Sequence, residues 1–289
     1  MEPTPTDILN ELESHYMTLV SEIEGTVRDG KSEIYPQYMG YQFMQGHLVE
    51  KPKVLFIGIN PGPGAAYEAG WKLSGRDGVW LVPTLRTGPR ETLFCYKRGS
   101  IRDGNVHWYD TTQKLKKNNT YLFKFTKLLE SLADAWGLKN EVRCGVKGTD
   151  MGNNGPLWSH WVQDTVMSVN LYPIATQKVS QLDSLFVQLR RKSFSHYRTN
   201  WDLQYKEFIA PMKTFIEWLH PSVVVCLGSK AFHDLTCDNN ETKVDNDGLL
   251  MNARIPSIIG VDRSRSNKNP WNNDDKLKNL ASIIAEKTL

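Results

Sequence analysis

Short apolar runs that end in polar turns alternate along the chain with stretches in which apolar residues recur every three or four positions. The apolar runs are typical of buried strands and lie at residues 54–59, 166–169, 223–227 and 255–261. The helical periodicity lies at residues 6–23, 122–132 and 206–219, after residue 230, and from residue 274 onward. Strands that alternate with helices predict an α/β protein. We therefore expect a three-layer α/β/α fold around a central, mostly parallel four-stranded sheet.

Two long segments break this alternation. Residues 63–117 and 143–160 are rich in Gly and polar residues and have no helical period, so we expect insertion loops there. Residues 1–48 read as an N-terminal helical extension. The 289 residues are enough for one large core, and the chain shows no internal repeat, so a single domain over residues 1–289 is predicted.

Composition narrows the class of protein only slightly. The formal net charge of +3 is a weak indicator of a nucleic-acid partner. No basic segment precedes an apolar core at the N-terminus and no run approaches a membrane span, so we expect a cytoplasmic protein without a membrane partner. The four cysteines contain no Cys-x-x-Cys pair, so free thiols rather than a metal site are expected.

Polar side chains follow three of the predicted strands. These are Asn60, Asn170 and Asp262. The carboxyl ends of parallel strands meet at one edge of a sheet, where α/β proteins bind their ligands. The three side chains are therefore predicted to share one pocket. The alternative is that each makes a turn or caps a helix, as Asn and Asp often do at strand ends.

The segment Gly58-Ile59-Asn60-Pro61-Gly62 resembles the first motif of the uracil-DNA glycosylase superfamily, above all its mismatch-specific and single-strand-selective branches. The resemblance runs from about residue 50 to the C-terminus and implies a three-layer fold of that type. It also implies that Asn60 orients the hydrolytic water at the sugar C1′. Asn170, in Val169-Asn170-Leu171-Tyr172-Pro173, takes the place of the residue that reads the pyrimidine edge. The remaining base-binding positions implied are Gly58, Ile59, Pro61, Gly62, Gly64 and Tyr172.

The last motif departs from the family pattern. The usual His-Pro-Ser occurs here as residues 220–222, but this triplet precedes a strand instead of following the final one. Asp262 stands after the final strand, where the family has His. A carboxylate there suits an oxocarbenium-like sugar or can polarise the attacking water. We therefore predict that Asn60 and Asp262 are catalytic, although Asp262 as a helix cap or ion-pair partner stays open.

Five basic residues and one serine are candidates for DNA contacts. The predicted set is Arg263, Ser264, Arg265, Lys230, Arg190 and Arg191. Lys230 also fits a plain surface position at a helix start. The aromatic segment 194–201 follows the basic residues 190–192, and it is suited either to stacking on an opened strand or to anchoring a loop to the core.

In the uracil-specific branches of the superfamily, a bulky aromatic after the first motif packs beside the pyrimidine C5. Residues 63–66 are small here, so the resemblance implies room at C5, and Asn153, Asn154 and Trp158 are candidates for a sugar pocket. These features resemble the bacterial anti-phage glycosylases that excise bulky modified cytosines, such as glucosylated hydroxymethylcytosine. The resemblance implies a monomeric, monofunctional enzyme that flips a nucleotide out of single- or double-stranded DNA. It implies no cofactor and no metal.

Three other functions stay open. A uracil or mismatched-thymine repair glycosylase also tolerates small residues beside C5. A non-catalytic DNA-binding module on the same fold is compatible with the non-standard last motif. A nucleotide-binding protein is a weaker alternative, because the Gly-Pro-Gly turn at residues 62–64 is not followed by the Gly-Lys-Ser/Thr of a phosphate loop.

Overall fold

The computed structural model describes the secondary-structure elements and part of the connections between them. The described residues are 3–28, 38, 43–45, 48–60, 73–74, 79–80, 120–138, 164–176, 178–237, 242–245, 247–252, 255, 257–263 and 269–288. The chain divides into two compact units, each described by itself. Unit 1 comprises Met1–Met44, Ile59–Thr87 and Val169–Leu219, and unit 2 comprises Gln45–Gly58, Gly88–Ser168 and His220–Leu289. The single domain expected from the sequence stays a prediction.

The protein is of the α/β class. Among the described residues, the main sheet has seven strands in the order β1-β5-β2-β6-β9-β8-β7. Five of them have four or five residues: β5 (Val166–Asn170), β2 (Val54–Gly58), β6 (Val223–Cys226), β9 (Ile258–Val261) and β8 (Leu249–Asn252). The edge strands β1 (Met44–Gln45) and β7 (Thr242–Val244) are shorter. The unit boundaries run through β1 and β5, and the other strands belong to unit 2.

The expected four-stranded sheet is therefore wrong in its strand number. The four predicted strands form as β2, β5, β6 and β9, and β2, β6 and β9 pair in parallel as expected. The missed strands β8 and β7 extend the sheet in antiparallel register. Their turn holds Gly248 at φ 78°, and the Asp245 carboxylate accepts hydrogen bonds from the N–H groups of Asp247 and Leu249. Asp247-Gly248 is a hairpin signal in the sequence.

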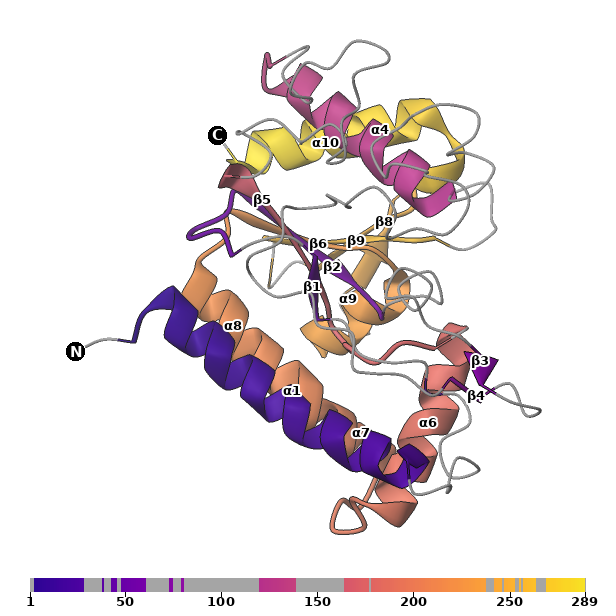
Figure 1. The fold of residues 1–289 in the computed structure, drawn as a ribbon. Helices are drawn as coiled ribbons and strands as arrows, with labels where there is room; N and C mark the ends of the chain where they lie inside the picture. The colour runs from indigo at the N-terminus through magenta and orange to yellow at the C-terminus, as the bar shows by residue number, and fades with distance from the viewer. Residues whose placement is uncertain are drawn as a thin grey trace. The chain divides into compact units, whose positions relative to one another are not determined.

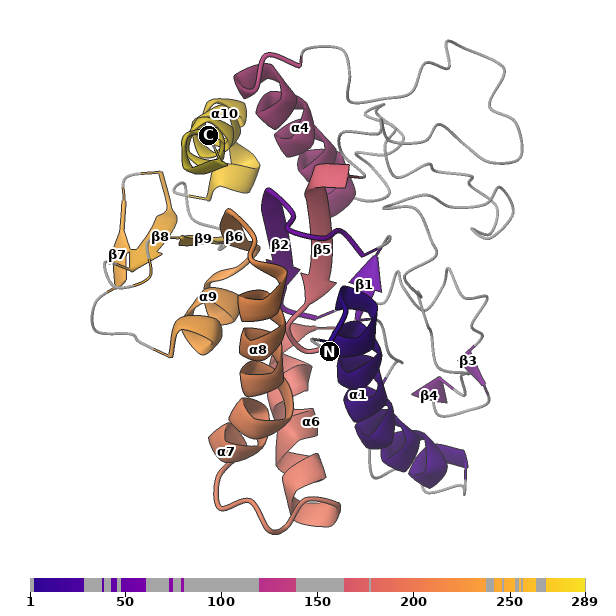
Figure 2. The same cartoon turned by 90° about the vertical axis from the view of Figure 1, so that its left-hand side faces the viewer.

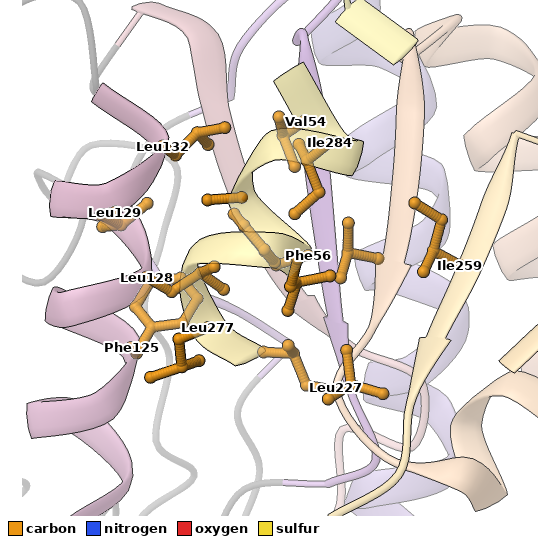
Figure 3. Packing of buried hydrophobic residues seen from close by; sticks show 14 of the residues in the cluster. Val54, Phe56, Phe125, Leu128, Leu129, Leu132, Leu227, Ile259, Leu277 and Ile284 are labelled. Atoms are coloured by element: carbon orange, nitrogen blue, oxygen red, sulfur yellow. The ribbon is translucent and has the colours of Figure 1, made fainter. Parts of the chain in front are cut away.

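Unit 2 places its helices on both faces of these strands (Figure 1). The helices α4 (Thr120–Ala135) and α10 (Asp274–Thr288) cover one face. The helix α9 (Ser229–Thr236) lies on the other, where the Phe232 ring meets Gly260 of β9. Alternate strand residues feed the core under α4 and α10 (Figure 3); they are Val54 and Phe56, Val223 and Val225, and Ile259 and Val261. Successive residues of each strand point to opposite faces of the sheet, and both faces are buried. These strands are therefore continuous apolar runs in the sequence.

The layer of α4 and α10 is held by apolar packing and by ion pairs at the start of α10. Phe125 of α4 packs edge-on against Phe56, with ring centroids 4.9 Å apart. Lys124 and Lys127 both reach Asp274 at the start of α10, at 2.9 and 2.6 Å. The short helix η3 (Pro270–Asn272) directly precedes α10. The ion pairs with Asp274 hold α10 against α4 above the sheet.

Unit 1 is mainly helical in its described residues. It contains α1 (Pro5–Arg28), α6 (Val179–Lys192), α7 (Asn200–Gln204) and α8 (Ala210–Leu219). A π-helical turn, η2 (Tyr205–Ile209), joins α7 to α8, so the three form one continuous rod (Figure 2). The pair β3 (Leu73–Ser74) and β4 (Val79–Trp80) is antiparallel. The helix α6 was not predicted, although its buried residues Leu182, Leu185, Phe186 and Leu189 have helical spacing.

Helix α1 lies along α8 and η2 in unit 1, as Figure 1 shows. Tyr16 is fully buried and stacks on Phe208 at 5.9 Å. Beside it, His15 Nε2–H donates to the Glu207 carbonyl at 2.9 Å and lies 3.2 Å from the Glu207 carboxylate. The hydrogen bond to Glu207 raises the pKa of His15 above its ordinary value. The helix α1 of the predicted N-terminal extension is thus packed into unit 1.

Gly260 is a position where added volume has a predictable cost. A Cβ there would lie 2.6 Å from Cγ of Phe232, closer than real Cβ contacts come. We expect Gly260→Ala to lower the free energy of unfolding by about 1–3 kcal/mol, the usual range for overpacking, as measured by urea denaturation. In a double-mutant cycle with Phe232→Ala, which removes two of the three nearest atoms, the two costs should be less than additive. Full additivity would contradict the contact.

Asp274 gives a prediction for low pH. Hydrogen bonds from Lys127 and Lys124 lower its pKa from 3.8 to about 2. A lowered folded-state pKa means that the stabilisation is present above pH 4 and is lost as the pH falls toward 2. We expect Asp274→Asn to reduce the free energy of unfolding by less than about 1 kcal/mol at pH 7, since the carboxylate is half-exposed. The difference from wild type should fade by pH 2. Asp275→Asn, at a more exposed carboxylate, should change stability less; an equal effect would show that Lys124 and Lys127 are not the cause.

Candidate active site

The segments that follow β2 and β5 are joined in unit 1. The N–H of Tyr172 donates to the Ile59 carbonyl at 2.9 Å, and the N–H of Asn170 donates to the Phe43 carbonyl at 2.8 Å. Asn60 and Asn170 are both half-buried at the exits of their strands. Two of the three polar strand exits singled out in the sequence therefore belong to one compact unit, on backbone that is held by main-chain hydrogen bonds.

The side chain of Asn60 is held by the segment after β5. Its Nδ2 donates to the Ile174 carbonyl at 3.2 Å and to the Thr176 hydroxyl oxygen at 2.9 Å. Thr176 is only 2% exposed, and its own O–H donates to the Lys178 carbonyl at 2.9 Å. Sequence reasoning missed Thr176, because nothing in a lone Thr signals a partner 116 residues earlier in the chain.

This network fixes which way the Asn60 carboxamide faces. The Ile174 carbonyl can only accept a hydrogen bond. The single proton of the Thr176 hydroxyl is used on Lys178, so toward Asn60 this oxygen also accepts. Two acceptors demand the NH₂ group, because the flipped amide would place Oδ1 against both of them. The Oδ1 atom is thereby turned to the opposite side of the amide.

Lys178, which ends this chain of hydrogen bonds, is also the N-cap residue of α6. Its N–H donates to the Gln181 side chain at 2.9 Å, and the Gln181 N–H donates back to its carbonyl at 3.0 Å. The orientation of Asn60 is therefore anchored through Thr176 to the start of a packed helix.

The side chain of Tyr172, a residue predicted to bind the base, packs in the interior of unit 1. Its side chain is fully buried, with ring centroids 5.1 Å from Phe186 and 5.5 Å from Phe208. A ring with no exposed surface offers a base nothing to stack on. We therefore assign Tyr172 to the aromatic core of unit 1. Gly58 and Ile59 are half-buried at the end of β2. Base binding by Gly58, Ile59 and Tyr172 stays a prediction.

Asp262 follows β9 in unit 2. Its N–H donates to the Gly248 carbonyl at 2.9 Å, and the residue is half-buried. β2, β6 and β9 are parallel, so Gly58 at the end of β2, Gly228 after β6 and Asp262 after β9 lie at the same edge of this sheet. Arg263 turns back into unit 2, where its guanidinium lies 5.6 Å from the centre of the Trp271 ring and 3.5 Å from the Leu227 carbonyl. Its cation is thus placed against the protein, and DNA binding by it stays a prediction.

Two further cations on the predicted DNA-binding list have partners inside the protein. Lys230 forms an ion pair with Asp234 at 3.1 Å, one turn along α9. Arg190 Nε donates to the Asn200 side chain at 2.7 Å, and another guanidinium nitrogen donates to the Arg198 carbonyl at 3.4 Å. Arg191, its neighbour, is exposed. Lys230 and Arg190 accordingly have structural roles that do not depend on DNA.

The described residues contain no group of three His, Cys, Asp or Glu side chains suited to a metal ion. Cys226 is fully buried in β6, and burial raises the pKa of its thiol, which makes it a poor nucleophile. Within the same part of the chain, no helix has the length and apolar character required to cross a membrane.

Several predicted site residues lie outside the described part of the chain. They are Pro61, Gly62, Gly64, Asn153, Asn154, Trp158, Ser264 and Arg265. Most of the two predicted insertion loops falls outside it as well. These assignments stay predictions from the sequence.

Comparisons of the chain with family models, with curated proteins and with solved structures gave no significant match. The resemblance to the glycosylase superfamily therefore rests on the residues of the motifs themselves.

Proposed function

We propose that the chain is a monofunctional DNA glycosylase, which hydrolyses the N-glycosidic bond of a flipped nucleotide and leaves an abasic site. The observation that carries this proposal is the held carboxamide of Asn60, in the motif that resembles the first motif of the uracil-DNA glycosylase superfamily. Hydrogen bonds of 3.2 and 2.9 Å from its NH₂ group fix the orientation of this carboxamide. A uracil-DNA-glycosylase-like arrangement of the α/β fold is part of the same proposal.

In the proposed reaction, Asn60 Oδ1 accepts a hydrogen bond from a water molecule and orients it toward the sugar C1′. The bond between C1′ and the base nitrogen breaks, and its electron pair leaves with the base. The water oxygen then bonds to C1′ and releases a proton to solvent. Orientation of one reactant lowers the barrier because its loss of freedom has already occurred in the folded protein.

Asp262 is the proposed second catalytic group. As C1′ loses the base it acquires positive charge, which a fixed carboxylate stabilises. Asp262 directly follows β9, at the sheet edge where β2 also ends, and it stands where the superfamily has its last motif. Asn170, at the end of β5, is proposed to hydrogen-bond the edge of the base through its amide.

The proposed substrate is a pyrimidine with a bulky C5 substituent, such as glucosylated hydroxymethylcytosine in phage DNA. The resemblance puts positions 63–66 beside C5, and the residues in the sequence there are small. Removal of such a base would block phage replication as an antiviral defence. A uracil or mismatched-thymine repair enzyme is the alternative substrate assignment for the same site.

Base release tests the proposed function. The protein is incubated with DNA that contains uracil, with DNA that contains mismatched thymine, and with phage DNA that contains glucosylated hydroxymethylcytosine; abasic sites are then scored by alkaline cleavage. We expect release from the phage DNA and a loss of about a hundredfold or more in Asn60→Ala and in Asp262→Asn. Asp275→Asn, an exposed carboxylate of α10, is the matched control and should keep wild-type activity.

Release of uracil or thymine alone would make the chain a repair enzyme. Failure to release any of the three bases, with DNA still bound, would leave a non-catalytic DNA-binding module and overturn the proposal.

Thr176 allows a finer test of how Asn60 works. Thr176→Val keeps the shape of the side chain but removes the acceptor for Asn60 Nδ2. We expect kcat for base release to fall about three- to tenfold, the usual worth of one hydrogen bond, with KM unchanged. Thr176→Ser keeps the hydroxyl and should restore kcat. A variant that only loosened the fold would not separate Val from Ser in this way, and equal rates in both would remove Thr176 from the mechanism.

A further inference from the structure

Two large aromatic side chains are exposed next to each other on the rod formed by α7, η2 and α8. Trp201 is 42% exposed and Tyr205 is 37% exposed, and their ring centroids are 6.2 Å apart. The amine of Lys213 lies 5.7 Å from the centre of the Tyr205 ring. We call Trp201, Tyr205, Lys206 and Lys213 the Trp201 surface. Lys206 is exposed, and its amine lies 6.0 Å from the Tyr197 ring centre.

The π-helical turn explains why Lys213 lies on the same side of the rod as Tyr205. In a regular α-helix, a residue eight positions after Tyr205 is rotated from it by about 80°. In η2 the N–H of Ala210 bonds to the Tyr205 carbonyl, a π-type bond that takes up one extra residue. Lys213 then falls within about 20° of Tyr205, which agrees with its amine lying close to that ring. The surface therefore depends on a departure from helical periodicity.

The acidic residues within this part of the rod are used in internal hydrogen bonds. Asp202 accepts the N–H of Thr199 at 2.9 Å in the capping box of α7. Glu207 is held by His15 and by the Tyr197 hydroxyl. The next exposed acid along the rod is Glu217. The cations of the Trp201 surface, together with the exposed Arg191, Lys192 and Arg198 nearby in the chain, outnumber these three acids.

We propose that the Trp201 surface binds an unpaired stretch of DNA, with bases stacked on Trp201 and Tyr205 and with phosphates near Lys206 and Lys213. Exposed rings flanked by amines are the combination that proteins use to bind single strands without reading their sequence. A duplex keeps its bases stacked inside and so cannot use the two rings. The proposal rests on the proposed function for its choice of nucleic acid and adds a contact with the strand away from the reacting nucleotide.

The test is the affinity of the full chain for a labelled, undamaged oligothymidine, measured by fluorescence anisotropy beside a duplex of the same length. We expect the double variant Trp201→Ala with Tyr205→Ala to weaken single-strand binding about tenfold or more, since each stacked base contributes strongly. Duplex affinity should change little. Trp201→Phe with Tyr205→Phe keeps both ring faces and should retain most of the affinity. Lys213→Ala should lower the slope of log affinity against log salt by about one.

Two control variants match these changes in unit 2. Met251→Ala removes an exposed apolar side chain, and Lys278→Ala removes an exposed lysine. Neither should affect single-strand affinity beyond a small charge effect. Circular dichroism melting checks that the variants fold, which their exposed positions favour.

Three results would overturn the inference. The first is wild-type single-strand affinity in the double alanine variant, and the second is an equal loss of affinity for duplex and single strand. The third is a difference in sedimentation between the DNA-free wild type and the DNA-free double alanine variant, which would indicate a protein interface. Undamaged oligothymidine contains no substrate base, so the outcome is independent of base release. Single-strand binding without base release would contradict the proposed function but would support the inference about the Trp201 surface.

Discussion

Burial of β2, β6 and β9 on both faces is the constraint on which the rest of unit 2 depends. Helices α4 and α10 cover one face and α9 covers the other, so alternate residues of each strand enter two different apolar layers. No polar side chain is tolerated within such strands, because it would lose its hydration without gaining a partner. Polar chemistry is thereby confined to the strand ends, where Asp262 stands after β9. At Gly260 the same constraint excludes even a methyl group.

A different constraint orients Asn60 in unit 1. Its carboxamide has donors on one atom and acceptors on the other, and only the surroundings decide which of them a ligand meets. The buried hydroxyl of Thr176 decides it by giving its own proton to the Lys178 carbonyl. A side chain held in this way needs no reorganisation when a ligand arrives, which is the condition for effective electrostatic catalysis. Thr176 therefore matters to the site through another residue, without any need to touch a substrate.

The sequence predicted those strands and helices that a local pattern of apolar residues determines. Continuous apolar runs located β2, β5, β6 and β9, and helical periodicity located α1, α4, α8 and α10. It missed β8, whose Leu249 is buried while Met251 is exposed, although Asp247-Gly248 marked the hairpin. It placed Asn60, Asn170 and Asp262 at strand ends. It did not show that Phe186 and Phe208 cover the Tyr172 ring, because position along the chain does not determine burial. The pairing of Asn60 with Thr176 and the alignment of Lys213 with Tyr205 depend on tertiary contact and on a π-type bond, and neither leaves a periodic signal.

The identity of Asn60 limits how the proposed reaction can proceed. A carboxamide does not take up a proton near neutral pH, so the water that it orients remains a weak nucleophile. A weak nucleophile reacts readily only with a carbon that is already electron-poor, which requires the bond from C1′ to the base to be largely broken before the water adds. The greater part of the rate acceleration must then come from stabilising the sugar cation and the departing base. Asp262 is suited to the first of these tasks because a carboxylate is negative, whereas the histidine usual in the superfamily is suited to the second. In the proposed reaction, the Asp that stands in place of the superfamily's His thus moves the stabilisation from the leaving base to the sugar cation.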